Sequence, residues 1–184
     1  MQNYEEFLDE ILVSEEALNN RIAELGQEIS RDYHDQDLHL ICILRGGVLF
    51  LSDLMRFIRV PHTIDFMAIS SYGTERHSTG HVRISLDLKS DILNRNVLLV
   101  EDIVDSGNTI ASIIELLHTR RPKSLRVCTL LDKPERREVD VPIHYCGFVI
   151  PNKFVFGYGL DMDEYYRNLP FIATVNLDRY HTEE

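Results

Sequence analysis

The stretch VLLVEDIVDSGNTI, residues 97–110, joins a short apolar run to a turn rich in polar residues. The run Val97–Val100 is typical of a strand in a parallel sheet that is covered on both faces. Two adjacent acids, Glu101 and Asp102, follow it directly, and small polar residues around Gly107 come next. Because open parallel sheets bind ligands beyond the carboxyl ends of their strands, the stretch predicts a ligand site here.

Apolar runs and helical periodicities alternate on both sides of this stretch. We expect further strands at residues 38–44, 62–70, 82–88 and 124–131, and helices at residues 47–58 and 109–120. The first third of the chain also reads as helix, since apolar residues recur at helical spacing after the N-cap Ser14. The predicted fold class is α/β, with a mainly parallel twisted sheet flanked by helices.

Composition limits the partners and the compartment. The 184 residues, 44% of them hydrophobic, suffice for one core, so a single domain over residues 1–184 is expected. The net charge of −11 argues against nucleic-acid and membrane partners, which need a basic surface. An acidic opening segment and the lack of a long apolar run predict a cytoplasmic protein without signal peptide. Cys42, Cys128 and Cys146 are interpreted as buried core thiols.

The side chains after the strand suit a phosphorylated sugar. At a fraying strand end, the Glu101 and Asp102 carboxylates can both turn toward one ligand and accept from a vicinal diol, with or without a metal. The backbone amides and hydroxyls of residues 105–109 can surround a phosphate at the start of the next helix. A dinucleotide fold would need a preceding GxGxxG, and a phosphate-transfer receiver would carry its acids on the first strand. A purely structural acid pair is the remaining alternative.

Five segments follow one another in the order of a known family. They are LRGG (44–47), SSYG (70–73), VLLVEDIVDSGNT (97–109), LLDKPERR (130–137) and IPNKFVFGYGLD (150–161). The third resembles the signature with which phosphoribosyltransferases bind phosphoribosyl pyrophosphate, and together they resemble the hypoxanthine-guanine phosphoribosyltransferases, bacterial ones above all. The resemblance implies the type I phosphoribosyltransferase fold, with a small hood over the active site formed mostly by the C-terminal segment.

The resemblance also implies an activity, purine salvage. Such an enzyme transfers the 5-phosphoribosyl group to hypoxanthine, and here also to guanine, and releases pyrophosphate with Mg²⁺ as cofactor. Relatives commonly form dimers or tetramers, so a homo-oligomer is expected. The alternative is a regulator of the same fold that senses phosphoribosyl pyrophosphate and binds RNA. It needs a basic surface and no complete purine pocket, so the acidic composition and the intact last two segments disfavour it.

By this resemblance, the opening stretch holds the sugar and the metal. Glu101 and Asp102 would bind the ribose hydroxyls and Mg²⁺, and Asp161 would be a further metal-associated acid. The loop for the 5′-phosphate consists of Asp105, Ser106, Gly107, Asn108 and Thr109. Asp105 is also the expected catalytic residue, which transfers a proton at purine N7.

The pyrophosphate site is expected at the end of another strand. By the same resemblance, Arg45, Gly46 and Gly47 would bind pyrophosphate together with Arg167. Glycines suit this role, since they let backbone amides approach an anion closely. A cis Leu44–Arg45 peptide is implied there, and Arg45 stands where some relatives carry lysine.

A lid and a purine pocket complete the expectations. Ser71 and Tyr72 would begin a mobile lid loop, which protects an oxocarbenium-like centre from water. The Lys133 ammonium has only donors, so it favours a purine 6-oxygen over the 6-amino group of adenine. Phe154 would stack on the base. The backbone of Val155 would read the purine edge, and Lys153 and Asp161 would be further members of the purine site.

Overall fold

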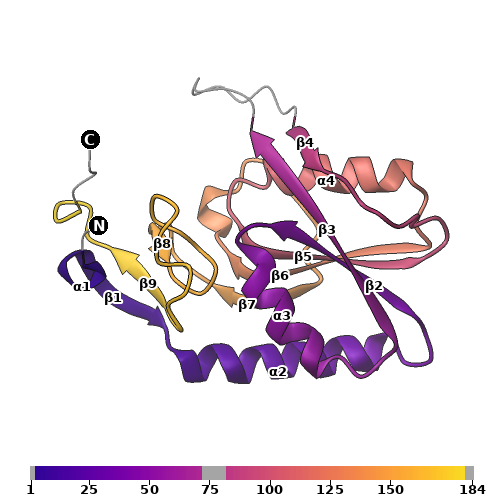
Figure 1. Cartoon of the computed structure of the whole chain (residues 1–184), viewed down its shortest axis with the longest axis horizontal. Coiled ribbons are helices and arrows are strands. Elements are labelled where there is room, and N and C mark those ends of the chain that lie inside the picture. The colour runs from indigo at the N-terminus through magenta and orange to yellow at the C-terminus, as the bar shows by residue number, and fades with distance from the viewer. Residues whose placement is uncertain (1–2, 72–81, 181–184) are drawn as a thin grey trace.

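The computed structural model describes residues 3–71 and 82–180, which form two sheets and the helices around them (Figure 1). The larger sheet has six strands in the order β4-β3-β2-β5-β6-β7 and is parallel except for the antiparallel β3–β4 pair. Its strands are β2 (Leu38–Leu44), β3 (His62–Ser71), β4 (Val82–Leu86), β5 (Asn96–Val104), β6 (Ser124–Asp132) and β7 (Tyr145–Val149).

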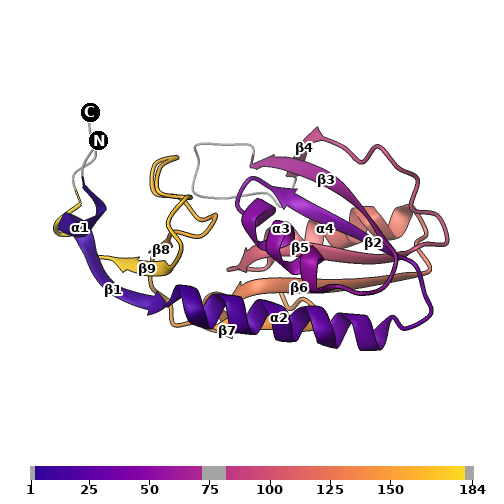
Figure 2. The ribbon, with the colours of Figure 1, turned by 60° about the horizontal axis from the view of Figure 1, so that its bottom comes forward.

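Helices cover both faces of this sheet (Figure 2). The side chains of α2 (Glu15–Asp32) and α3 (Gly47–Phe57) pack with those of one face, including Leu40, Leu98 and Leu130. The helix α4 (Asn108–Thr119) packs on the opposite face, where its residues join Ile41, Leu99 and Val127 in a second core. The expected class is therefore confirmed: a mainly parallel sheet between layers of helix, as continuous apolar strands require.

The smaller sheet is the hood. Its order is β1-β9-β8, with antiparallel pairing between β1 (Leu8–Val13), β9 (Ile172–Val175) and the short β8 (Val155–Phe156). The expectation of helix throughout the first third was wrong for residues 8–13, because they find a strand partner at the other end of the chain. Among the described residues before β2, α1 (Tyr4–Phe7) and α2 are the helical segments. Phe7, Phe156 and Tyr166 pack together and join the two ends of the chain.

The strand of the deciding stretch is longer than its apolar run. β5 continues to Val104 because β6 goes on pairing with it, as in the pairs Glu101↔Thr129 and Ile103↔Leu131. The strand end therefore does not fray at the two acids. Pairing with β2 on the other side stops at Cys42↔Val100, so β2 no longer covers the edge of β5 at the acids.

Three smaller expectations have different outcomes. Cys42 and Cys128 are buried as expected, but Cys146 is only half-buried. The polar segment of residues 71–81 lies almost entirely outside the described residues. Within the described part of the chain, no helix has the length and apolar character needed to cross a membrane.

Candidate active site

Glu101 and Asp102 form a buried acid pair where β5 leaves the cover of β2. Glu101 is 8% exposed, and its Oε2 atom is buried without a hydrogen-bond partner. Burial, together with the neighbouring Asp102 carboxylate, raises the pKa of Glu101 well above its ordinary value, and burial also raises the pKa of Asp102. Two neighbouring acids whose pKa values are raised by burial suit a ligand that offers hydroxyl groups or positive charge.

The turn after β2 lies directly against this pair. A β-carbon at Gly46 would come within 1.5 Å of Asp102 Oδ2, so only glycine leaves room for the carboxylate. Gly47 begins α3, and the Leu44–Arg45 peptide is cis, as expected. The turn of residues 45–47, called the RGG turn below, and the acid pair therefore form one surface.

The loop of residues 105–109 is hydrogen-bonded to the segment that follows β6. The Ser106 carbonyl accepts hydrogen bonds from the backbone N–H groups of Glu138 and Val139, at 2.9 and 3.1 Å. The Asn108 side chain donates to Glu138 Oε2 at 2.7 Å. Gly107 has a φ of +89° and precedes α4 without a side-chain cap, so the helix N-terminus is open to an anion.

Asp105 lies between two cations of the segment after β6. Arg136 Nε is 3.2 Å from Asp105 Oδ1, and Arg136 belongs to the short 3₁₀ helix η1 (Pro134–Arg136). Lys133, just before η1, is 7% exposed, and burial lowers its pKa, an effect that the nearby Asp105 opposes. The expected proton-transfer group and the expected 6-oxygen donor are thus neighbours.

A second charged cluster lies in the segment between β8 and β9. Arg167 donates to Gly159 O at 2.8 Å and pairs with Asp161 Oδ1 at 2.8 Å. Glu164 lies 3.3 Å from Arg167 and 2.7 Å from Arg45. The RGG turn, the acid pair and the hood meet at one cleft of about 380 Å³, lined by Ile43, Leu44, Arg45, Gly46, Ile69, Glu101, Asp102, Thr109, Asp161 and Arg167.

The expected purine residues 153–155 lie at the start of β8 in the hood and do not line this cleft. Phe154 is 51% exposed, whereas Val155, the first residue of β8, is buried. The Lys153 ammonium lies 2.6 Å from Glu10 and 3.9 Å from Asp9, so it pairs with the N-terminal strand of the hood. Of the expected lid residues, Ser71 ends β3 and Tyr72 lies outside the described residues.

Sequence reasoning missed three charged residues of this region, namely Arg136, Glu138 and Glu164. The first two stand within or beside the quoted segment LLDKPERR, so its two consecutive arginines were an available signal. Glu164 lies halfway between Asp161 and Arg167, and this regular spacing of charges was its only signal.

Comparison with known proteins identifies the family. The family model described as "Phosphoribosyl transferase domain" matches residues 10–163. The chain belongs to this family. Among its phosphoribosyltransferase relatives, the hypoxanthine phosphoribosyltransferase of Salmonella typhimurium is 49% identical over 170 residues, 91% of this chain and 96% of the relative. The hypoxanthine-guanine phosphoribosyltransferase of Mycobacterium tuberculosis is 52% identical over 172 residues, 90% of this chain and 85% of the relative.

Solved phosphoribosyltransferase structures agree with the fold. A hypoxanthine phosphoribosyltransferase from Staphylococcus aureus superimposes with a TM-score of 0.93 at 45% identity, covering 97% of both chains. A hypoxanthine-guanine phosphoribosyltransferase from Bacillus anthracis gives a TM-score of 0.88 at 45% identity, covering 91% of this chain and 99% of that one. The expected resemblance and the type I fold are thus confirmed.

Proposed function

We propose that the protein transfers the 5-phosphoribosyl group from phosphoribosyl pyrophosphate to hypoxanthine and guanine, forming the nucleoside monophosphates IMP and GMP and releasing pyrophosphate. Relatives about half identical to the chain carry the names of these activities. The observation that carries the proposal is the cleft in which the acid pair Glu101–Asp102, the RGG turn and Arg167 meet. The cleft brings together carboxylates that can bind a diol and cationic groups that can bind a diphosphate.

The charges of the site suit this transfer. As the pyrophosphate leaves with the bonding electrons, positive charge grows on the ribose and negative charge on the leaving group. Glu101 and Asp102 would hold the ribose hydroxyls and stabilise the positive centre. Arg45 and Arg167, with the amides of the RGG turn, would stabilise the departing diphosphate, and the loop of residues 105–109 would bind the 5′-phosphate.

The base would enter between the hood and the segment after β6. Purine N9 attacks the ribose C1, and Asp105 would accept the proton that leaves N7. The buried Lys133 would donate to the 6-oxygen, and the exposed ring of Phe154 would stack on the base. An ammonium repels a 6-amino group, so adenine should be a poor substrate.

A divalent metal fits the acid pair. Mg²⁺ is usually bound by one or two carboxylates together with substrate oxygens and water, and Glu101 Oε2 is a buried acceptor without a partner. We therefore propose that Glu101 and Asp102 hold Mg²⁺, and Asp161 lines the same cleft. When bound, the ion neutralises charge on the diphosphate.

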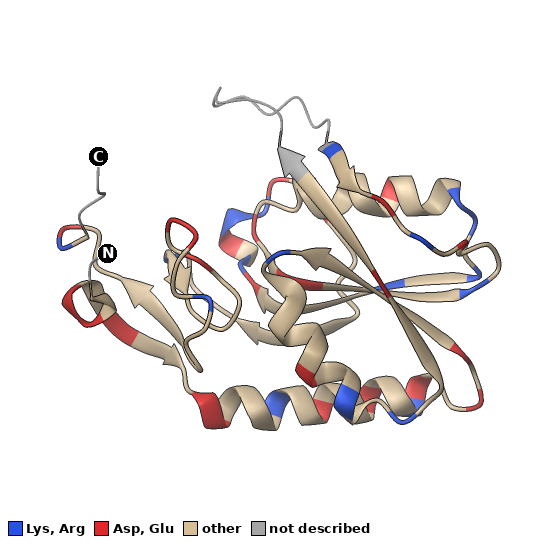
Figure 3. Ribbon diagram, in the orientation of Figure 1, with Lys and Arg blue, Asp and Glu red and all other residues tan. Residues whose placement is uncertain are grey.

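The proposal extends to partners and location. The net charge of −11, with acids gathered on α1, β1 and α2, favours small-molecule substrates over nucleic acid or a membrane (Figure 3). It also favours the enzyme over the RNA-binding regulator. We propose a single cytoplasmic domain that forms a homo-oligomer, a dimer or tetramer, and the exposed Val48 of α3 supports α3 as part of an interface.

The direct test is product identification. The protein is incubated with phosphoribosyl pyrophosphate and Mg²⁺ and with hypoxanthine, guanine, xanthine or adenine separately, and the nucleotide is identified by mass spectrometry. We expect IMP and GMP, with little AMP. Formation of no nucleotide from any purine would overturn the proposal, and tight RNA binding in a parallel gel-shift experiment would then favour the regulator.

A further inference from the structure

We propose that Glu164 is a positioning residue that competes with the diphosphate for Arg45 and Arg167 and so weakens pyrophosphate binding. The inference rests on the proposed function and deepens it. Glu164 Oε1 lies 2.7 Å from Arg45, and Glu164 Oε2 lies 3.3 Å from Arg167. One carboxylate thus bridges the two arginines that the diphosphate would need.

The backbone holds Glu164 at the tip of a tight hairpin. Met162 and Tyr165 exchange two backbone hydrogen bonds, of 3.1 and 3.0 Å, around Asp163 and Glu164. Both tip residues have positive φ, 49° and 71°, which is unusual for residues with side chains. Asp161 Oδ2 also accepts from the Glu164 N–H at 2.9 Å. The carboxylate is therefore presented by an ordered turn rather than by a freely moving chain.

Arg167 and Arg45 respond differently when the diphosphate competes with Glu164. Arg167 keeps its bonds to Asp161 and Gly159 O when Glu164 leaves, so its guanidinium stays in the cleft. Arg45 and Glu164 are largely exposed, with side chains 68% and 58% accessible, so their ion pair is weak and exchangeable. A diphosphate carries more charge than one carboxylate and displaces it. After transfer, Glu164 can take the arginines back as pyrophosphate leaves.

The magnitude follows from the exposure of the pair. Exposed ion pairs contribute little, so removing the Glu164 charge should tighten pyrophosphate binding by about two- to five-fold at low salt. The gain should shrink as salt screens the pair. The same variant should show stronger product inhibition by pyrophosphate.

The experiment measures the dissociation constant of inorganic pyrophosphate with Mg²⁺ by titration calorimetry. It compares the wild-type protein with Glu164→Gln and with Asp163→Asn, which removes one charge from the same hairpin tip, where the Asp163 carboxylate accepts from the Tyr180 hydroxyl. We expect tighter binding for Glu164→Gln and none for Asp163→Asn, and a smaller tightening when Glu164→Gln is made in an Arg45→Gln background, where only the pair with Arg167 remains to be released. Unchanged or weaker binding by Glu164→Gln, or equal tightening by Asp163→Asn, would overturn the inference.

The two proposals fail in different ways. A wild-type protein that forms IMP but binds pyrophosphate no less tightly than Glu164→Gln contradicts only the role of Glu164. A wild-type protein that forms no nucleotide and binds no pyrophosphate contradicts both. Thermal unfolding of each variant checks that the exposed substitutions leave the fold intact.

Discussion

Asp102 fills the space into which a side chain at Gly46 would project. The distance between its Oδ2 atom and a β-carbon at Gly46 would be 1.5 Å, far inside contact distance. The two residues come from different strand ends, β5 and β2, and they are 56 positions apart in the sequence, from 46 to 102. The expected pyrophosphate turn and the expected sugar-binding acids are therefore a single fitted unit, and disturbing one displaces the other.

Gly46→Ala should inactivate the enzyme while the fold persists. The methyl group forces the Asp102 carboxylate or the turn to move by an ångström or more, and a misplacement of that size costs on the order of 10²-fold in rate. We expect kcat/KM for IMP formation to fall by about that factor, with the circular dichroism spectrum retained. A variant with wild-type kcat/KM would show that the fitted contact is unimportant.

Asp105→Asn should separate chemistry from binding. An amide cannot accept the N7 proton, and general acid–base help contributes about 10²–10⁴-fold, so kcat should fall within that range. The dissociation constant of phosphoribosyl pyrophosphate, measured by calorimetry, should change by less than about three-fold, because asparagine preserves the size of the side chain and the loop backbone. Equal losses in both quantities would assign Asp105 to substrate binding instead.

Lys133→Met should relax the choice of base. The substitution keeps the length of the side chain and removes its charge, so the 6-oxygen loses its donor. We expect kcat/KM for hypoxanthine to fall by about 10- to 200-fold, which corresponds to about 1–3 kcal/mol. Adenine should lose much less, so the ratio of the two values is the measurement. Equal losses for both bases would contradict a role in reading position 6.

Two phenylalanines near β8 should behave in opposite ways. Phe154 is 51% exposed and Phe156 is fully buried against Phe7 and Tyr166. Phe156→Ala should lower the free energy of unfolding by about 3–5 kcal/mol. Phe154→Ala should leave it nearly unchanged but weaken binding of IMP by about 1–3 kcal/mol, the value of a stacked base. Urea denaturation and nucleotide titration distinguish the two effects.

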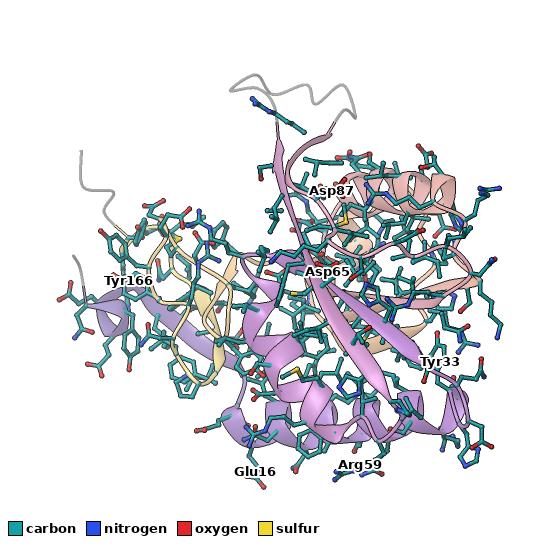
Figure 4. All side chains as sticks on the ribbon, turned by 45° about the vertical axis from the view of Figure 1, so that its right-hand side comes forward. Glu16, Tyr33, Arg59, Asp65, Asp87 and Tyr166 are labelled. Atoms are coloured by element: carbon teal, nitrogen blue, oxygen red, sulfur yellow. The ribbon has the colours of Figure 1, made fainter. Side chains whose placement is uncertain are left out.

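Asp65 should make the free energy of unfolding depend on pH, with stability lost at low pH. It lies on β3 within the large sheet, far from Tyr166 of the hood (Figure 4), and accepts from the backbone N–H groups of Phe66, Lys89 and Ser90, each at 2.9 Å. Burial raises the pKa of Asp65, but these hydrogen bonds outweigh it and lower the pKa below the ordinary value of 3.8. The charged form is therefore favoured in the folded protein.

Its contribution is present above the ordinary pKa of 3.8 and is lost as pH falls through the lower pKa of the folded state. Asp65→Asn should cost about 1–3 kcal/mol near neutral pH, and its difference from the wild-type protein should shrink below 3.8. Urea unfolding at several pH values measures this difference. Asp91→Asn, an exposed acid with one local hydrogen bond, is the control. A gap independent of pH would contradict the assignment.

Local pattern was enough to predict most strands of the large sheet, though not their order. The strand at residues 38–44 has the predicted bounds because it is apolar at almost every position, and the helix expected at 47–58 ends one residue earlier. The hood was harder, since residues 8–13 contain three consecutive exposed positions and pair with residues 172–175. Nothing within a short window of sequence reveals such a partner.

The same limit applies to the site. The acid pair and the polar loop after it are neighbours in sequence, so their chemistry was visible in one stretch. The contacts Arg45–Glu164 and Asp105–Arg136 join residues from different segments, and they depend on how the hood and η1 are placed over the sheet. Such pairings follow from tertiary packing, which a single sequence does not display.

The hood sheet combines a strand from one end of the chain with two from the other. The order of synthesis therefore determines when the hood can form. All six strands of the large sheet are synthesised before β9, whereas β1 is synthesised first and pairs with that late strand. The turns proposed to bind phosphate can therefore form early. The hood beside the proposed base pocket is completed only when translation has passed residue 175.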